Sequence, residues 1–405
     1  MPEELPKLRP VNMQWVQWQG QEVLSLQDPL RLGDGSLMVP RPIAPLLGLM
    51  DGTRDLNGLR TGFLLRTGVQ LLPSQVESIV EKLDENLLLD SHRFRDAMEH
   101  ALLDYRSSPF REPALAGAGY PDDGAALRST LDDYCQKAGV NGADPSGGVL
   151  GLISPHIDYH RGWQTYAEAW HPARRAVREA DLVIILGTDH SGSSGSLTLT
   201  RQDYATPWGS MPTDVPIVDR LAEILGEDNA FAEEVHHVGE HSIELASVWL
   251  HYYAGGQPKR LLPILCGHHE ALLGSDGPEA TRVWEALSYL SDVAKQQNTL
   301  VVAAGDLSHM GPAFGDPLPL DPAGKASIRS TDETWLEVAC SGDSSRLTSH
   351  LLEHGDPTRI CGSAPIHYMI AILQNAQGQV VAYDQCPADE EFGSLVSIAG
   401  VLYSA

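Results

Sequence analysis

The sequence predicts an α/β protein, with a mixed or mostly parallel sheet flanked by helices and a small winged-helix-like domain before it. Three observations indicate this fold class. From Val149 onward, short apolar runs alternate with helical stretches, the pattern of strands buried between layers of helices. Each apolar run is followed by a polar or thiol side chain. Residues 1–105 instead show short helical pieces separated by Pro and Gly, with no histidine before His92.

The N-terminal region, residues 1–105, is expected to form a compact module of helices followed by a small hairpin. Its expected elements are a short helix at Pro40–Met50, an Asp-Gly turn at Asp51–Thr53, a helix with Leu56, Leu59 and Phe63 on one face, a helix that a capping box opens at Ser74–Glu77, and a short strand at Leu87–Leu89. Folds of this kind usually bind DNA, but the acidic composition described below argues against DNA binding here.

Residues 106–148 are rich in Gly, Pro, Ala and Asp and are interpreted as a linker and the start of the next domain, with one helix near Ala125–Lys137. The α/β domain then occupies residues 149–405. Its buried strands are expected at Val149–Ile153, Leu182–Leu186, Leu261–Leu265 and Thr299–Ala304.

Composition excludes several classes of function. The formal charge of −26, from 54 acidic and 28 basic side chains, would repel a phosphate backbone, so we expect no nucleic-acid partner. No apolar run approaches the roughly 20 residues that span a bilayer, and Met1–Pro10 lacks the apolar centre of a signal peptide, so we expect a cytoplasmic protein without a membrane partner. The five cysteines are widely spaced without a CxxC pair, which argues against a disulfide framework and a zinc ribbon.

Residues suited to metal binding follow the predicted strands. The set consists of His156 after the first strand, Asp189 and His190 after the second, Cys266 after the third, and Asp306 with His309 after the fourth. Because ligands bind at the carboxyl ends of strands in open α/β sheets, these side chains are expected to converge on one crevice. The alternative is that they are ordinary loop residues and helix caps. Of the 16 histidines, 14 lie between His156 and His367, which favours metal or acid–base chemistry.

Two further segments carry candidate residues. His241 is expected in the first turn of a helix, with Glu240 and Glu244 in capping or surface roles, while the preceding His236 and His237 are expected to be solvated. Cys361 precedes a turn and an apolar helix that begins near Pro365. By itself, this segment favours interpreting the lone thiol as a small core residue, since free cysteines usually are.

Taken together, these segments resemble the Memo family, in the long bacterial form of the AmmeMemoRadiSam system protein B type. The matching stretches are Arg111–Tyr120 (REPALAGAGY), Ser154–Tyr159 (SPHIDY), Leu186–His190 (LGTDH), Glu240–Glu244 (EHSIE), Gly305–His309 (GDLSH) and Ile360–Gly362 (ICG). They occur in family order across about residues 111–405. No single stretch is specific to the family, but the six stretches in this order are.

The resemblance implies a fold similar to that of class III extradiol ring-cleaving dioxygenases. It implies a metal site with His156, His190 and Cys361 as ligands, with Asp306 and His309 close by, and it implies iron or copper as the metal. This chain departs from the common pattern with Ile157-Asp158 where many members have Ala-Gly, and with Gly305 where Ser is usual. Asp158 adds a carboxylate beside His156 and leaves the ligand set open.

Two imidazoles and one thiolate would leave open positions on the metal, and the soft thiolate favours iron, copper or zinc over magnesium or calcium. The first hypothesis is an iron-dependent oxidoreductase in which His241 or His309 moves protons and Asp306 orients a histidine. Its expected substrate is a peptide or a small aromatic molecule. The alternatives are a non-enzymatic metal-binding adaptor and a hydrolase that uses zinc-bound water.

The N-terminal module resembles the winged-helix peptide-recognition domains of the PqqD type. The likeness lies in Met38-Val39-Pro40, Asp51-Gly52 and the stretch that ends at Leu83-Asp84. This resemblance implies that the module holds a peptide or a partner protein. The family name implies radical-SAM and AMMECR-type proteins as partners.

Overall fold

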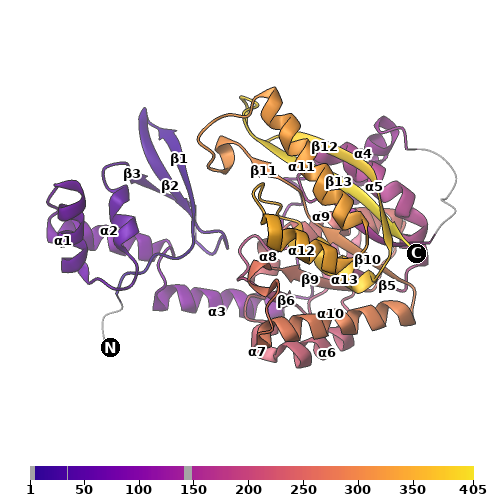
Figure 1. The fold of residues 1–405 in the computed structure, drawn as a ribbon. Coiled ribbons are helices and arrows are strands. Elements are labelled where there is room, and N and C mark those ends of the chain that lie inside the picture. Colours follow the sequence, from indigo (N-terminus) through magenta and orange to yellow (C-terminus); the bar gives the residue numbers. More distant parts are fainter. Residues whose placement is uncertain (1–4, 34, 141–147) are drawn as a thin grey trace. The chain divides into compact units, whose positions relative to one another are not determined.

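The computed structural model describes residues 5–33, 35–140 and 148–405 (Figure 1). The chain forms two compact units, Met1–Ser108 and Pro109–Ala405, and each is described by itself. The stretch interpreted as a linker, 106–148, contributes helix α4 (Gly124–Lys137) to the second unit. Among the described residues, no helix is long and apolar enough to cross a membrane.

In its described residues, the first unit combines a small antiparallel sheet with three α-helices and one 3-10 helix (Figure 1). Its elements are β1 (Asn12–Trp18), β2 (Gln21–Gln27), β3 (Ser36–Pro40), η1 (Ala44–Leu49), α1 (Leu56–Thr67), α2 (Pro73–Glu85) and α3 (His92–Ser107). The strands pair in the order β1-β2-β3. One face of this sheet packs on the helices through a core that includes Leu26, Leu46, Leu59, Phe63 and Val76.

Several predicted details of this unit were wrong. The sheet precedes the helices instead of following them, and its first strand is exposed on both faces, so it lacks the apolar alternation that identifies a strand. Leu89 forms only an isolated bridge with Leu8, not a strand. Ser74 lies inside α2, and the Gln75 side chain accepts a hydrogen bond from the Leu72 backbone N–H at 2.8 Å.

The second unit is built on a mixed, largely parallel sheet, which confirms the predicted fold class. Its strands are β4 (Val149–Ser154), β5 (Leu182–Thr188), β6 (Leu197–Leu199), β9 (Leu261–Cys266), β10 (Thr299–Ala304), β11 (His309–Met310), β12 (Gln377–Pro387) and β13 (Leu395–Ser404). Their order in the described sheet is β11-β13-β4-β10-β5-β9-β6, and β12 pairs with β13. The four predicted strands are β4, β5, β9 and β10, and they form its parallel centre.

Helices cover both faces of this sheet. They are α4, α5 (Tyr159–Glu179), α6 (Val215–Leu225), α7 (Glu227–Ala230), α8 (His236–Gly239), α9 (Ser242–Tyr253), α10 (Pro278–Gln296), α11 (Pro322–Cys340), α12 (Ser344–His354) and α13 (Ser363–Leu373), with short 3-10 turns η2 (Glu270–Leu272) and η3 (Pro312–Phe314). A two-stranded ribbon joins β7 (Tyr204–Thr206) to β8 (Gly209–Met211).

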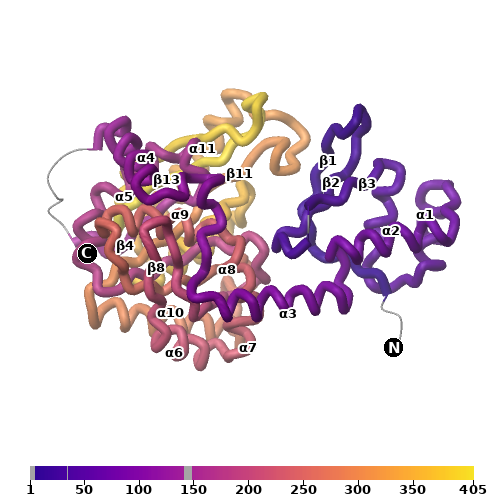
Figure 2. The backbone as a smooth tube through the Cα atoms, turned by 180° about the vertical axis from the view of Figure 1, so that it is seen from behind, coloured from indigo at the N-terminus to yellow at the C-terminus, as the bar shows by residue number. Residues whose placement is uncertain are grey.

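Alternate residues of the central strands belong to two separate cores, as a pleated sheet requires. On β5, Ile184 packs with α6, α10 and α13, whereas Ile185 packs with α4, α5 and α9. Figure 2 shows α4 and α5 on the second of these faces. Because the central strands are parallel, the loops after β4, β5 and β10 meet at one edge of the sheet.

Candidate metal centre

Three histidines meet at this carboxyl edge. His156 follows β4, His190 follows β5, and His241 is the residue at which α9 begins. Their ring centroids are 4.9 Å apart for His156 and His190, 5.0 Å for His190 and His241, and 5.3 Å for His156 and His241. One ring nitrogen of each lies within 4.8 Å of the others. The convergence predicted for His156 and His190 is therefore present, and His241, named above as a candidate for moving protons, belongs to the same cluster.

The second nitrogen of each ring is held by an oxygen acceptor. His156 Nδ1 donates to the Ala304 carbonyl at 3.2 Å, and His190 Nδ1 donates to Glu240 Oε2 at 2.9 Å. His241 Nδ1 lies 3.1 Å from Glu240 Oε1. Histidines that bind metals usually donate their other N–H in this way, which fixes the tautomer and aims the free nitrogen at the ion. The three Nε2 atoms are therefore the ones left to face the centre.

Cys361 brings a sulfur to the same place. Its Sγ lies 3.2 Å from His156 Nε2. Burial alone would raise the pKa of this thiol, but the neighbouring His156 and His190 lower it below its ordinary value. A thiolate is the form that binds metal. The donor set, three imidazole nitrogens and one sulfur, fits iron, copper or zinc.

The loop that carries Cys361 approaches the β10 loop very closely. Thr188 Oγ1 donates to the Cys361 carbonyl at 3.1 Å, and the Gly362 N–H donates to the Asp306 carbonyl at 2.9 Å. A Cβ atom at Gly305 would lie only 2.4 Å from Gly362 Cα. The absence of a side chain at Gly305 therefore permits this approach.

Glu240 is a site residue that the sequence analysis placed in a capping or surface role. It is buried, and its two oxygens accept from the backbone N–H groups of His190, His241 and Ser242 at 3.1, 2.7 and 3.0 Å. Although burial disfavours the charge, His190 and His241 hold the pKa of Glu240 well below its usual range. In return, Glu240 and Cys361 outweigh burial and raise the pKa of His190 well above its usual range. Glu240 therefore links two of the three imidazoles.

A buried ion pair supports Glu240 from behind. The Arg111 guanidinium pairs with Glu244, donates from Nη2 to the Glu240 carbonyl at 2.8 Å, and donates from Nε to the His237 carbonyl at 2.8 Å. Glu244 also accepts from Tyr120 Oη at 2.6 Å. This network explains why the Arg111–Tyr120 stretch accompanies the histidine motifs in the sequence. Glu244, expected at the surface, is fully buried.

Asp306 and His309 lie beside the cluster. Asp306 Oδ1 accepts from the His156 N–H at 2.8 Å, and Oδ2 lies 3.8 Å from His156 Nε2. His309 Nδ1 donates to the carbonyls of Leu307 at 2.9 Å and Arg359 at 3.2 Å. Burial lowers the pKa of His309, although Asp306 opposes the shift. Asp306 thus contacts a predicted ligand, while the acid–base role of His309 stays a prediction.

Other predicted residues lie outside the cluster. Asp158 caps α5 and accepts from the N–H and Nε of Arg161 at 3.1 and 2.6 Å, so its carboxylate is used elsewhere. The Cys266 thiol is buried in the core shared with α10 and α13, and burial raises its pKa well above the ordinary value. Neither residue adds a ligand to the histidine cluster.

The expectation that His236 and His237 are solvated was wrong. Both are buried in the short helix α8. His236 Nδ1 donates to Asp189 Oδ2 at 2.9 Å, and with Glu233 these residues form a second group whose donor atoms lie within 4.8 Å of one another. Their polar sequence concealed this burial, because a partner such as Asp189 lies 47 residues away in the chain.

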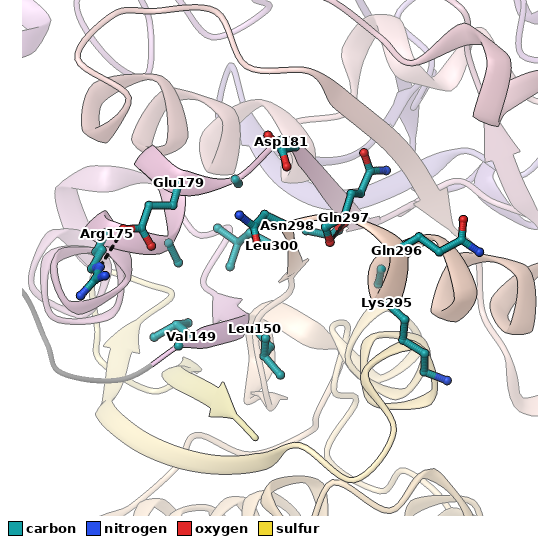
Figure 3. Close-up of a pocket in the computed structure, with 15 residues that line it drawn as sticks. Val149, Leu150, Arg175, Glu179, Asp181, Lys295, Gln296, Gln297, Asn298 and Leu300 are labelled. Carbon is teal, nitrogen blue, oxygen red and sulfur yellow. Dashed lines mark hydrogen bonds and ion pairs between the residues drawn. The ribbon is translucent and has the colours of Figure 1, made fainter.

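A cavity of about 780 Å³ lies at the opposite edge of the sheet (Figure 3). It is lined by the first residues of β4 and β10, such as Val149 and Leu300, and by Asp181 just before β5. An ion pair of 2.9 Å between Arg175 and Glu179 borders it. Since the parallel strands run away from this cavity toward the histidines, it is not part of the candidate metal centre.

Known proteins match the chain over most of its length. The profile of the family described as "Memo-like protein" matches residues 111–402. A MEMO1 family protein of Aquifex aeolicus is 25% identical over 385 residues, which cover 93% of this chain and 95% of that protein. One from Thermus thermophilus is 28% identical, covering 82% and 94%. The crystal structure of an uncharacterized protein from Escherichia coli K12 is a distant match, with a TM-score of 0.38 and 12% identity over 63% of this chain and 99% of that one.

Proposed function

The chain belongs to the Memo family, and from this premise we propose that it is a mononuclear metal protein, an oxidoreductase that uses iron. The observation that supports the proposal most strongly is the convergence of the His156, His190 and His241 rings with the Cys361 sulfur, every imidazole having its other nitrogen held by an oxygen. We assign His156, His190 and Cys361 as metal ligands, and His241 as the additional nitrogen donor within reach. Copper and zinc are the alternative metals.

The same residues suggest how the centre would work. Bound iron would supply redox chemistry and open positions for small ligands. Asp306 fixes His156 through its backbone N–H and so keeps the imidazole in place. His309, whose pKa is lowered by burial, is neutral at pH 7 and can accept a proton from a substrate bound beside Asp306. Because the His190 side chain is 40% exposed, a substrate can reach the centre from solvent.

Protein purified without added metal tests this function when it is assayed for iron content and for oxygen uptake with phenols and peptides. The expected result is one iron per chain and oxygen uptake that is lost in His309→Gln with the iron retained. His354→Gln, on the exposed end of α12, is the matched control and should change neither quantity. Iron-loaded protein that consumes no oxygen with any candidate substrate would contradict the enzymatic function.

The alternative is a non-enzymatic adaptor, and the first unit favours it. A groove of about 410 Å³ lies between β3 and α2, lined by apolar side chains that include Met38, Val39, Ile79 and Leu83. Because β3 is the last strand of its sheet in the described residues, an extended peptide could add to its free edge while its side chains enter the groove. The Aquifex relative spans both units, which agrees with a function that uses them together.

We propose radical-SAM and AMMECR-type proteins as the partners of this groove. A pull-down with the full chain should recover such a partner, and Ile79→Glu should abolish recovery while Leu65→Glu, an exposed residue of α1 outside the groove, should not. If recovery is unchanged by His156→Ala together with His190→Ala and no turnover is found, the adaptor function replaces the enzymatic one. Equal recovery with Ile79→Glu would contradict the groove as the binding surface.

A further inference from the structure

A further cluster of polar atoms, separate from the Asp189–Glu233–His236 group, is buried on the face of the central sheet opposite α5. His269 Nε2, His367 Nδ1 and Tyr368 Oη have no hydrogen-bond partner among the described residues. The three side chains are only 2%, 0% and 0% exposed. Leaving a buried polar atom unpaired costs free energy, and native proteins rarely accept this at three neighbouring groups. The cluster is therefore a candidate site for a bound ion or small molecule.

The three rings contact one another although they come from separate elements. His269 lies between β9 and η2, while His367 and Tyr368 are on α13. The centroids of the His269 and His367 rings are 5.3 Å apart, and that of Tyr368 lies 5.8 Å from His269. Trp284 of α10 contacts His367 at 5.5 Å between centroids. None of these residues belongs to the group formed by His156, His190 and His241.

The protonation of His367 is fixed by its neighbours. Its Nε2 lies 3.1 Å from the Ser344 carbonyl and 3.0 Å from Thr348 Oγ1. Because the Thr348 hydroxyl itself donates to the Ser344 carbonyl, both neighbours accept from Nε2–H, and Nδ1 carries the lone pair. Burial lowers the pKa of His367 to about 4 and that of His269 to about 3, and both imidazoles are therefore neutral at pH 7. His156 at the first centre likewise has one ring nitrogen on a backbone carbonyl, while its other nitrogen faces the Cys361 sulfur. This is the usual arrangement of a metal-binding histidine.

We propose that His269 Nε2 and His367 Nδ1 hold a second metal ion of the soft monovalent class, copper(I), with Tyr368 Oη lining the site. Neutral imidazoles suit copper and zinc rather than magnesium or calcium. The trio carries no negative charge, and a divalent ion would bring more uncompensated charge into a buried place than a monovalent one. The 5.3 Å between the two rings is also the distance between His156 and His241 at the first centre.

Anaerobic titration with copper(I) against a competing chelator tests the site. In a chain that carries His156→Ala, His190→Ala and Cys361→Ser, we expect one equivalent of copper(I) to remain bound. Adding His269→Gln and His367→Gln together should weaken that binding at least 100-fold. His268→Gln is the matched control, because His268 is the exposed neighbour of His269, and it should retain the equivalent. Circular dichroism checks that each variant is folded.

Three results would overturn the proposal. The first is a triple variant that is folded and binds no copper(I). The second is an equivalent that persists after both histidines of the second site are replaced. The third is a crystal structure of the copper-loaded protein that shows only a water molecule bonded to the three atoms, a water being the competing occupant for such a cluster.

Discussion

Replacing Glu240 with Gln removes the carboxylate that orients the imidazoles and leaves the imidazoles themselves in the chain. Oε2 accepts from His190 N and Nδ1 at 3.1 and 2.9 Å, and Oε1 accepts from His241 N and Ser242 N at 2.7 and 3.0 Å. A glutamine keeps one of these acceptors and turns an NH₂ group toward the other pair of donors. Loss of such an orienting carboxylate typically lowers metal affinity 10–100-fold, or about 1.4–2.7 kcal/mol.

The assay is a competition titration with Zn(II), a redox-inert probe, against a chelator at pH 7. Glu240→Gln should bind 10–100-fold more weakly than the unchanged protein. Glu179→Gln, an exposed carboxylate paired with Arg175, is the control and should bind normally. If folded Glu240→Gln binds Zn(II) within twofold of the unchanged protein, then Glu240 does not orient the ligands and the reasoning is refuted.

Three further outcomes follow from the same structure. Arg111→Ala leaves Glu244 charged and buried, so the free energy of unfolding in urea should fall by about 3–5 kcal/mol, and a loss below about 1 kcal/mol would count against the ion pair. Burial lowers the pKa of His237 to about 3, so below about pH 6.5 the unfolded chain binds a proton that the folded chain does not. The free energy of unfolding should therefore be at its full value above about pH 6.5 and fall by up to about 1.4 kcal/mol per pH unit below it. His237→Gln should reduce this slope. Gly305→Ser should displace Gly362, destabilise the protein by about 1–3 kcal/mol and weaken metal binding. Unchanged Zn(II) affinity would show that the Cys361 loop can move without disturbing the metal ligands.

The sequence predicted those parts of the centre that depend on strand direction. Four apolar runs identified the parallel strands, and their common direction brought His156, His190 and Asp306 to one edge. Cys361 could be assigned only through the family resemblance, because a lone thiol before a helix is as compatible with a core position. The structure places its sulfur against His156.

What the sequence could not predict depends on contacts between distant segments. Glu240 looks like a helix-capping residue until His190, 50 residues away, is seen to donate to it. His237 lies in a polar stretch, yet its ring is buried. Its Nε2 donates to the Thr198 carbonyl of β6 at 3.1 Å, and its Nδ1 accepts from the Tyr204 hydroxyl of β7. Strand β1 is exposed on both faces, so its sequence lacks the sustained alternation of apolar and polar residues by which a strand is predicted.

X-ray absorption at the metal K-edge, on protein purified without added metal, tests the central claim that His156, His190, His241 and Cys361 form one metal centre. The expected spectrum shows nitrogen donors together with one sulfur at about 2.3 Å. In Cys361→Ser the sulfur contribution should disappear while nitrogen donors remain. A metal-loaded protein whose spectrum contains no sulfur, or keeps its sulfur in Cys361→Ser, would contradict this centre.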